Sequence, residues 1–153
     1  MSNPFADLRQ AVCAQLLAGP GVTYAELYDG EDPERLRAIA SSRGPGALVR
    51  IATAEGSDQG PRSAVCCVLG LHVILLATSV SGRGTAAAVS EQLLWDALDA
   101  LINTTSSCAW LRSPWRLDSF LVEDQTANTT IRSLALKAHA DLSGWTPPAA
   151  PAT

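Results

Sequence analysis

The stretch that decides the fold is residues 64–77, which read AVCCVLGLHVILLA and are followed by the turn SVSGRGT at residues 79–85. An apolar run of this length with little alternation predicts a strand that is covered on both faces. After the turn, apolar side chains recur at helical spacing, which predicts a helix over residues 85–103. The apolar side of this helix carries Val89, Leu93, Leu94, Leu98, Leu101 and Ile102. We expect this strand and helix to form the packed centre of the domain.

Two further helices are predicted before this unit. Residues 3–18 read as a helix that begins at the capping residue Asn3 and ends at Gly19, which is expected to take the left-handed conformation of a helix end. Residues 32–39 read as a second, short helix capped by Asp32. Its few large apolar residues indicate that it lies on the domain and not within it.

The remaining segments predict a sheet. Residues 22–28 form a short strand or an extended segment, and residues 47–52 form a strand. The polar loop at residues 55–62 is expected to connect strand 47–52 to the central strand as a hairpin. A further strand is predicted at residues 115–122, followed by a loop at residues 123–129.

The last predicted strand shows a period of two. One face carries Leu134, Leu136, Ala138, Ala140 and Leu142, and the other carries Ser133, Lys137, His139 and Asp141. This alternation is typical of a half-exposed antiparallel strand, which we expect to be able to meet a neighbouring molecule. Residues 144–153 are rich in Pro and Ala and are not expected to contribute to a core.

Together these elements predict one α+β domain over residues 1–143 and a C-terminal tail over residues 144–153. The expected sheet is mixed and mostly antiparallel, with about four to five strands, and packs against an N-terminal helix, a short helix and one long helix. A chain of 153 residues with 47% hydrophobic and 17% charged residues suits such a domain.

Charge and composition exclude several function classes. The net charge of -4 argues against broad, non-specific nucleic-acid binding, which requires a basic surface. No secretory leader is recognisable at the N-terminus, and the apolar run of 14 residues is shorter than the roughly 20 needed to span a membrane. We therefore expect synthesis in a reducing cytoplasm, with Cys13, Cys66, Cys67 and Cys108 as buried, reduced thiols.

No catalytic, metal or cofactor residue can be assigned from the sequence. Gly82-Arg83-Gly84 precedes a helix, where anions can bind, but it lacks the Lys-Ser/Thr ending of a phosphate-binding loop. Cys66 and His72 share a strand face but lie about 20 Å apart along it, which is too far for a nucleophile and its base. His72 is interpreted as a satisfied core residue, and the chain as a non-enzymatic protein.

Surface residues are the remaining candidates for function. Trp110, Trp115 and Arg116 are of the types enriched in protein interfaces, although both tryptophans could equally close the edge of the core. The loops at residues 55–62 and 123–129 are the other candidate contacts. The residues predicted to contact partners are Arg62, Arg83, Arg112, Trp115, Arg116, Glu123, Asp124, Lys137 and Trp145.

The layout of the chain resembles a known family. A short helix, Gly44-Pro45-Gly46 and a strand lead to the long apolar strand, which ends Ala77-Thr78-Ser79. A turn with Gly and Arg then opens a helix of the form Val89-x-x-x-Leu93-Leu94-x-x-x-Leu98-x-x-Leu101, and Pro114-x-Arg116-Leu117 precedes the closing strand. This order of elements, over about residues 1–142, resembles the Mu-type minor tail proteins of tailed phages, which are related in architecture to tail terminators.

The resemblance implies a structural virion protein with a mixed sheet and flanking helices. Tail terminators form a hexameric ring at the head-proximal end of the tail tube, stop tube polymerisation and join the tail to the head. The implied partners are other copies of the chain, the major tail-tube protein and a head-tail connector or completion protein, with DNA passing through the ring and no membrane. The alternatives are a neck or head-tail connector protein, or a small ligand-binding domain or enzyme that uses Gly82-Arg83-Gly84.

Overall fold

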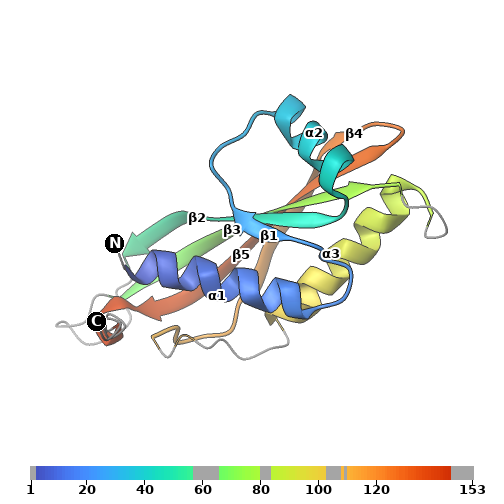
Figure 1. The fold of residues 1–153 in the computed structure, drawn as a ribbon. Coiled ribbons are helices and arrows are strands. Elements are labelled where there is room, and N and C mark those ends of the chain that lie inside the picture. Colours follow the sequence, from blue (N-terminus) through green and yellow to red (C-terminus); the bar gives the residue numbers. More distant parts are fainter. Residues whose placement is uncertain (1–2, 57–65, 80–83, 103–107, 109, 146–153) are drawn as a thin grey trace, which may run out of the picture.

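The computed structural model describes residues 3–56, 66–79, 84–102, 108 and 110–145, and shows one five-stranded sheet with helices on both faces (Figure 1). The elements, in chain order, are α1 Pro4–Ala18, β1 Ala25–Leu27, α2 Pro33–Arg43, β2 Gly46–Gly56, β3 Cys66–Thr78, α3 Ala86–Ile102, β4 Arg116–Gln125, β5 Thr129–Asp141 and a 3₁₀ turn, Leu142–Gly144. The strand order is β1-β2-β3-β5-β4, with β1 parallel to β2 and every other neighbouring pair antiparallel. The predicted α+β class with a mixed, mostly antiparallel sheet is confirmed.

β3 is the centre of the sheet, as predicted. It pairs with β2 on one side and along its whole length with β5 on the other. Odd-numbered side chains from Cys67 to Ala77 enter the core beneath α1 and α3, whereas Ile74 and Leu76 enter a smaller core beneath α2. Both faces of β3 are therefore covered, which accounts for its lack of alternation.

α3 packs on the sheet with the predicted side, but small residues and not the large ones occupy most of the centre of the contact. Its fully buried residues are Leu93 and Leu101 together with three small ones, Ala86, Ser90 and Ala97. The other predicted apolar residues, Val89, Leu94, Leu98 and Ile102, contact the core but are only partly buried. Small side chains let the helix axis approach the sheet closely, so the larger ones are displaced to the flanks.

The helices α1 and α2 begin at the predicted capping residues, but the conformation at the end of α1 differs from the prediction. Asn3 Oδ1 accepts a hydrogen bond from Ala6 N at 2.9 Å, and Asp32 Oδ1 accepts one from Arg35 N at 2.9 Å. Gly19, predicted to be left-handed, has φ −81° because its N–H closes a tight turn onto Leu16 O at 3.2 Å. The positive φ, +88°, falls on Gly21 instead.

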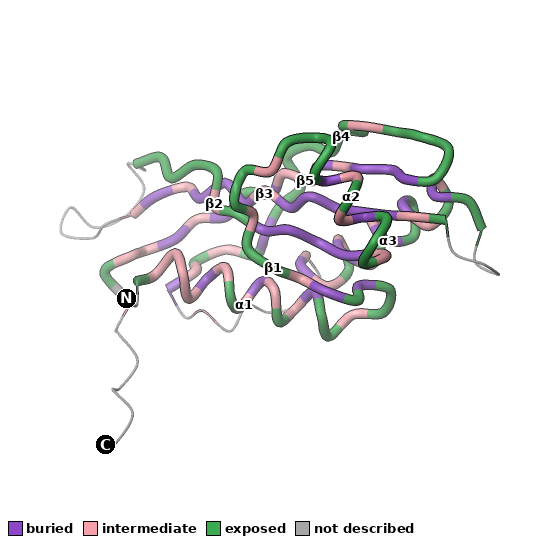
Figure 2. The backbone as a smooth tube through the Cα atoms, turned by 45° about the horizontal axis from the view of Figure 1, so that its top comes forward, coloured by how far each residue is buried: buried purple, intermediate pink, exposed green. Residues whose placement is uncertain are grey.

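The last strand is antiparallel and partly exposed on one face, as predicted, but the expectation that it is free to meet a neighbour is wrong. β5 begins at Thr129, pairs with β3 on one side and β4 on the other, and is buried along most of its length. Figure 2 shows the contrast, since the tube of β4 is exposed almost throughout and that of β5 is largely buried. One face of β5 enters the core beneath α1 and α3, whereas the other is covered beneath α2 at Ile131 and is partly exposed from Ala135 onward.

Candidate functional site

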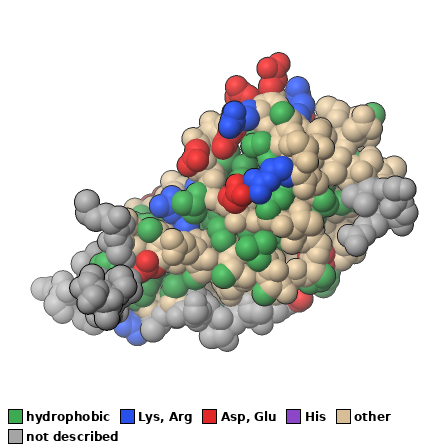
Figure 3. Space-filling view, viewed as in Figure 1, with side chains coloured by type: hydrophobic (Ala, Val, Ile, Leu, Met, Phe, Trp, Pro, Cys, Tyr) green, Lys and Arg blue, Asp and Glu red, His purple; other side chains and the backbone are tan. Residues whose placement is uncertain are grey.

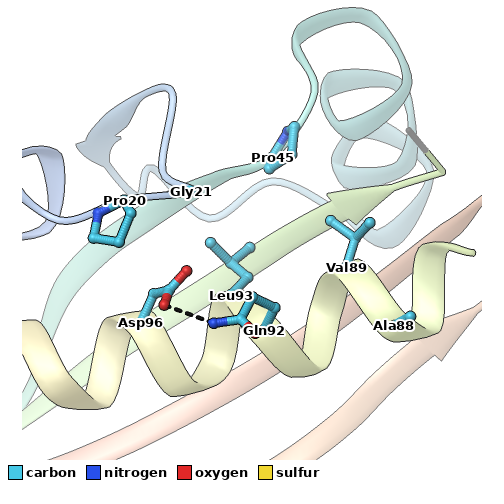
Figure 4. Close-up of a pocket in the computed structure, with 8 residues that line it drawn as sticks. All are labelled: Pro20, Gly21, Pro45, Ala88, Val89, Gln92, Leu93 and Asp96. Atoms are coloured by element: carbon cyan, nitrogen blue, oxygen red, sulfur yellow. Dashed lines mark hydrogen bonds between the residues drawn. The ribbon is translucent and has the colours of Figure 1, made fainter. Parts of the chain in front are cut away.

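A groove of about 520 Å³ lies between α3, the segment after α1 and the start of β2 (Figure 4). In its lining, Gln92 Nε2 donates a hydrogen bond to Asp96 Oδ1 at 2.9 Å. Gly21 has φ +88°, which favours glycine, and a Cβ at this position would also lie 2.7 Å from Asp96 Oδ2. The residues that line the groove are Pro20, Gly21, Pro45, Ala88, Val89, Gln92, Leu93 and Asp96. This lining holds no nucleophile and no general base beside the carboxylate, so it does not form a catalytic constellation.

A shallower hollow of about 310 Å³ lies on the part of the sheet that α2 leaves open. Arg50 Nε donates a hydrogen bond to His72 Nδ1 at 3.1 Å, and Lys137 Nζ lies 3.6 Å from Asp118 Oδ1. Burial, and then the charge of Arg50, lower the pKa of His72, which favours the neutral imidazole that accepts the hydrogen bond from Arg50. His72 is thus a satisfied residue of the sheet, as predicted, although it is only partly buried.

The cysteines and acids do not gather into a metal site in the described part of the chain. Cys67 is buried, whereas Cys13, Cys66 and Cys108 are only partly buried, although the sequence predicted burial for all of them. Burial raises the pKa of the Cys67 and Cys13 thiols, which keeps them protonated and unreactive at neutral pH. Among the described residues, no helix is long and apolar enough to cross a membrane.

The two tryptophans that were candidate interface residues lie in the core. Trp115 is 1% exposed and Trp110 is 5% exposed, and both belong to the cluster beneath α1 and α3. Trp115 is therefore not available to a partner, and the assignment of this residue to an interface is corrected. The adjacent Arg116 is exposed at the start of β4 and remains a candidate. Arg62 and Arg83 lie outside the described residues.

Most of the other predicted contact residues are bonded within the chain. Arg112 Nη2 lies 3.2 Å from Asp141 Oδ2, and Lys137 pairs with Asp118. Trp145 Nε1 donates a hydrogen bond to Asp7 Oδ2 at 2.7 Å, which ties the end of the described chain to the first turn of α1. Figure 3 shows acidic and basic side chains interspersed over α2, so this face does not present one sign of charge.

Glu123 and Asp124 lie at the end of β4 and not in a long loop. β4 runs to Gln125 and β5 starts at Thr129, so the predicted loop at residues 123–129 is reduced to residues 126–128. Glu123 Oε1 accepts a hydrogen bond from Ser133 Oγ at 2.6 Å. Arg37 on α2 binds Asp124 through two bonds, Nε to Oδ2 at 2.6 Å and Nη2 to Oδ1 at 3.0 Å. This pair fastens the β4–β5 hairpin to α2.

Exposed apolar side chains are the feature that the sequence analysis missed. We call Leu117, Phe120, Leu121 and Val122 the β4 patch, and Leu17 and Leu27 the β1 patch, after the two edges of the sheet at which they lie. Trp95, on the outer side of α3, is the other large apolar residue exposed in the described part of the chain. The sequence signal was the run Phe120-Leu121-Val122, which places apolar side chains on both faces of one strand. Such a run is equally typical of a buried strand.

Comparisons with known proteins show a likeness of fold. No family model matches the chain, and no curated protein matches it. A solved structure entitled "Virion of native gene transfer agent (GTA) particle" contains a chain that superposes with a TM-score of 0.57 at 15% sequence identity. The match covers 92% of this chain and 99% of that chain. The two chains share one fold.

The extent of the match matters more than its sequence identity. Because nearly the whole of both chains is covered, the shared fold includes the five-stranded sheet and the helices on its two faces. At this low identity the likeness shows the fold and assigns no residue a role.

Proposed function

We propose that this chain is a structural virion protein of a tailed phage or a phage-like particle. The observation that carries the proposal is the shared fold with a chain of the gene transfer agent virion, which extends over almost the full length of both. The order of elements that resembles the Mu-type minor tail proteins points in the same direction. The location implied is the virion, with assembly in the cytoplasm of the host.

Within the virion, we assign the chain the role of a tail terminator or tail-completion protein. Such a protein forms a homo-hexameric ring at the head-proximal end of the tail tube, where it stops polymerisation and joins the tail to the head connector. Apolar patches at both edges of the sheet support this role, because a closed ring needs two different contact surfaces on every copy. The partners are the major tail-tube protein and a connector or completion protein. DNA would pass through the ring without being read.

Removal of the gene from a host that produces the particle tests the role. A terminator is needed to stop the tube, so the expected result is tubes of abnormal and variable length together with heads that lack tails, as seen by electron microscopy. Restoring the wild-type gene should restore tails of uniform length. Tails of normal length that are not attached to heads would instead assign the chain to the neck or head-tail connector. Normal, infectious or transducing particles would contradict both roles.

A second experiment identifies which protein the chain contacts. Purified protein is added to polymerising tail-tube protein, and the mixture is cross-linked and analysed by mass spectrometry. Cross-links to the tube protein and shorter tubes are expected for a terminator. Cross-links to portal-side proteins alone would support the connector role.

A further inference from the structure

Exposed apolar residues gather at the two edges of the sheet. Six of the seven large apolar side chains exposed in the described part of the chain belong to the β4 patch or the β1 patch, and Trp95 is the exception. β4 and β1 are the edge strands of the described sheet, so each has one side without a hydrogen-bonded neighbour among the described strands. A soluble protein normally shields such edges, because they pair readily with other chains.

The two patches lie largely on the same face of the sheet. Leu27 is paired with Val49, whose side chain enters the core beneath α1. Leu117 and Phe120 are paired with Leu136 and Leu134, which enter that same core. Leu27 and the larger part of the β4 patch therefore point to the side of α1 and α3.

α1 extends the β1 patch on this side. Leu17 lies near the end of α1, and α1 packs against β1. In the described structure, α1 and α3 leave the outer face of β4 uncovered (Figure 1). A neighbouring α1, brought to this edge, would cover it.

The strand directions and lengths of the two edges match. Following the pairings across the sheet, β1 and β2 run one way, β3 runs the other way, β5 returns and β4 is again reversed. A second copy placed beside β4 in the same orientation therefore brings its β1 antiparallel to β4. Irregularities between Leu117 and Ser119, and between Val122 and Asp124, leave residues 119–122 as the regular segment of β4, which suits the three residues of β1.

The charges at the two edges are complementary in this arrangement. Antiparallel pairing brings the segment that follows β1 toward the start of β4. That segment carries Asp29, Glu31 and Asp32 and no base, a charge of −3. The start of β4 carries Arg116, whose pairing with Lys137 places it on the α2 face, and the acidic segment leads into α2. Opposite charges thus meet on the face that has fewer apolar residues.

We propose that β4 of one copy binds β1 and the end of α1 of the next copy, so that the sheet continues from subunit to subunit. The interface rests on the proposed function, since it supplies the head-to-tail contact of the ring. An isologous contact between two β4 strands would leave the β1 patch exposed and is disfavoured for that reason.

Two single variants and their mixture test the contact. Phe120→Glu places a charge in the β4 patch, and Leu27→Glu places one in the β1 patch. Each variant alone should remain monomeric in analytical ultracentrifugation at concentrations where the wild-type protein associates, a loss of at least about thirtyfold in affinity. The equimolar mixture should form a one-to-one dimer, because one intact β4 edge and one intact β1 edge remain. Trp95→Glu is the matched control and should associate like the wild type.

A charge swap gives a readout that misfolding cannot produce. Arg116→Glu and Asp29→Arg should each weaken association, and the double variant, which carries both changes on every copy, should recover it. Association of Leu27→Glu alone, a mixture that stays monomeric, or a wild-type protein that remains monomeric up to about 1 mM would overturn the interface. None of these results bears on the tail-length experiment, so the proposed role and the proposed contact can fail separately.

Discussion

β3 and β4 each contain a run of large apolar side chains, but the run is buried in β3 and exposed in β4. β3 lies between two strands and between helices on both faces, and most of its side chains are fully buried. β4 lies at the edge, where one of its residues is partly buried and the others are exposed. The difference follows both from position in the strand order and from composition, because β4 carries six polar or charged residues among its ten and β3 is almost wholly apolar. Burial in β3 stabilises the monomer, whereas exposed apolar area in β4 is available to a partner.

The largest effect should come from truncating a core leucine of β3. Leu75 is fully buried, so Leu75→Ala should lower the free energy of unfolding by about 2–5 kcal/mol through lost burial and a residual cavity. The control is Leu121→Ala in β4, where the side chain is 57% exposed and the change should stay within about 0.5 kcal/mol. Urea unfolding of dilute, monomeric protein measures both. Equal losses in the two variants would mean that β4 is part of the core.

Gly46 and Gly56 allow the same comparison of buried and exposed positions within one strand, β2. A Cβ at Gly46, in the buried half of β2, would lie 2.3 Å from ring atoms of Tyr24, whereas a Cβ at Gly56, at the exposed end, would meet nothing within 4 Å. Gly46→Ala should therefore cost about 1–3 kcal/mol by displacing the ring. Gly56→Ala should be neutral or stabilise by about 0.4–1 kcal/mol, because alanine restricts the unfolded chain. Thermal melts would separate the two, and a melting temperature unchanged by Gly46→Ala would show that the ring moves freely.

These contrasts indicate what could be predicted from the sequence. The apolar run of β3, the spacing of α3 and the caps Asn3 and Asp32 predicted the elements correctly, because each depends on residues near in sequence. Strand order depends on pairings between distant segments, such as β3 with β5, and no local pattern encodes it. The burial of Trp115 and the exposure of Phe120 both follow from that order. The β4 patch and the β1 patch were missed for the same reason, because exposure at a sheet edge depends on strand order.

Loss of the ion pair between Arg37 on α2 and Asp124 on β4 should have a smaller effect on the free energy of unfolding. The hydrogen bonds from Arg37 hold the pKa of Asp124 below its ordinary value of 3.8. A carboxylate with a lowered pKa contributes stability above that ordinary value and loses it as pH falls through the folded value. Asp124→Asn should thus lower the urea midpoint slightly at neutral pH, and the difference from wild type should vanish in acid. A difference that persisted at about pH 2 would have to come from something other than the charge pair.

The smallest expected effect concerns His72, a polar residue within the apolar strand β3. It lines the hollow on the part of the sheet that α2 leaves open. Burial and the charge of Arg50 lower its pKa below 6.5, so the unfolded chain binds the proton more readily than the folded one. Stability should therefore fall as pH drops below about 6.5, until the folded imidazole is itself protonated. Protonation also removes the acceptor for Arg50 Nε. His72→Gln, which keeps an acceptor but does not titrate, should flatten the urea midpoint between about pH 6.5 and 5. An unchanged slope in this variant would show that a group other than His72 causes the pH dependence.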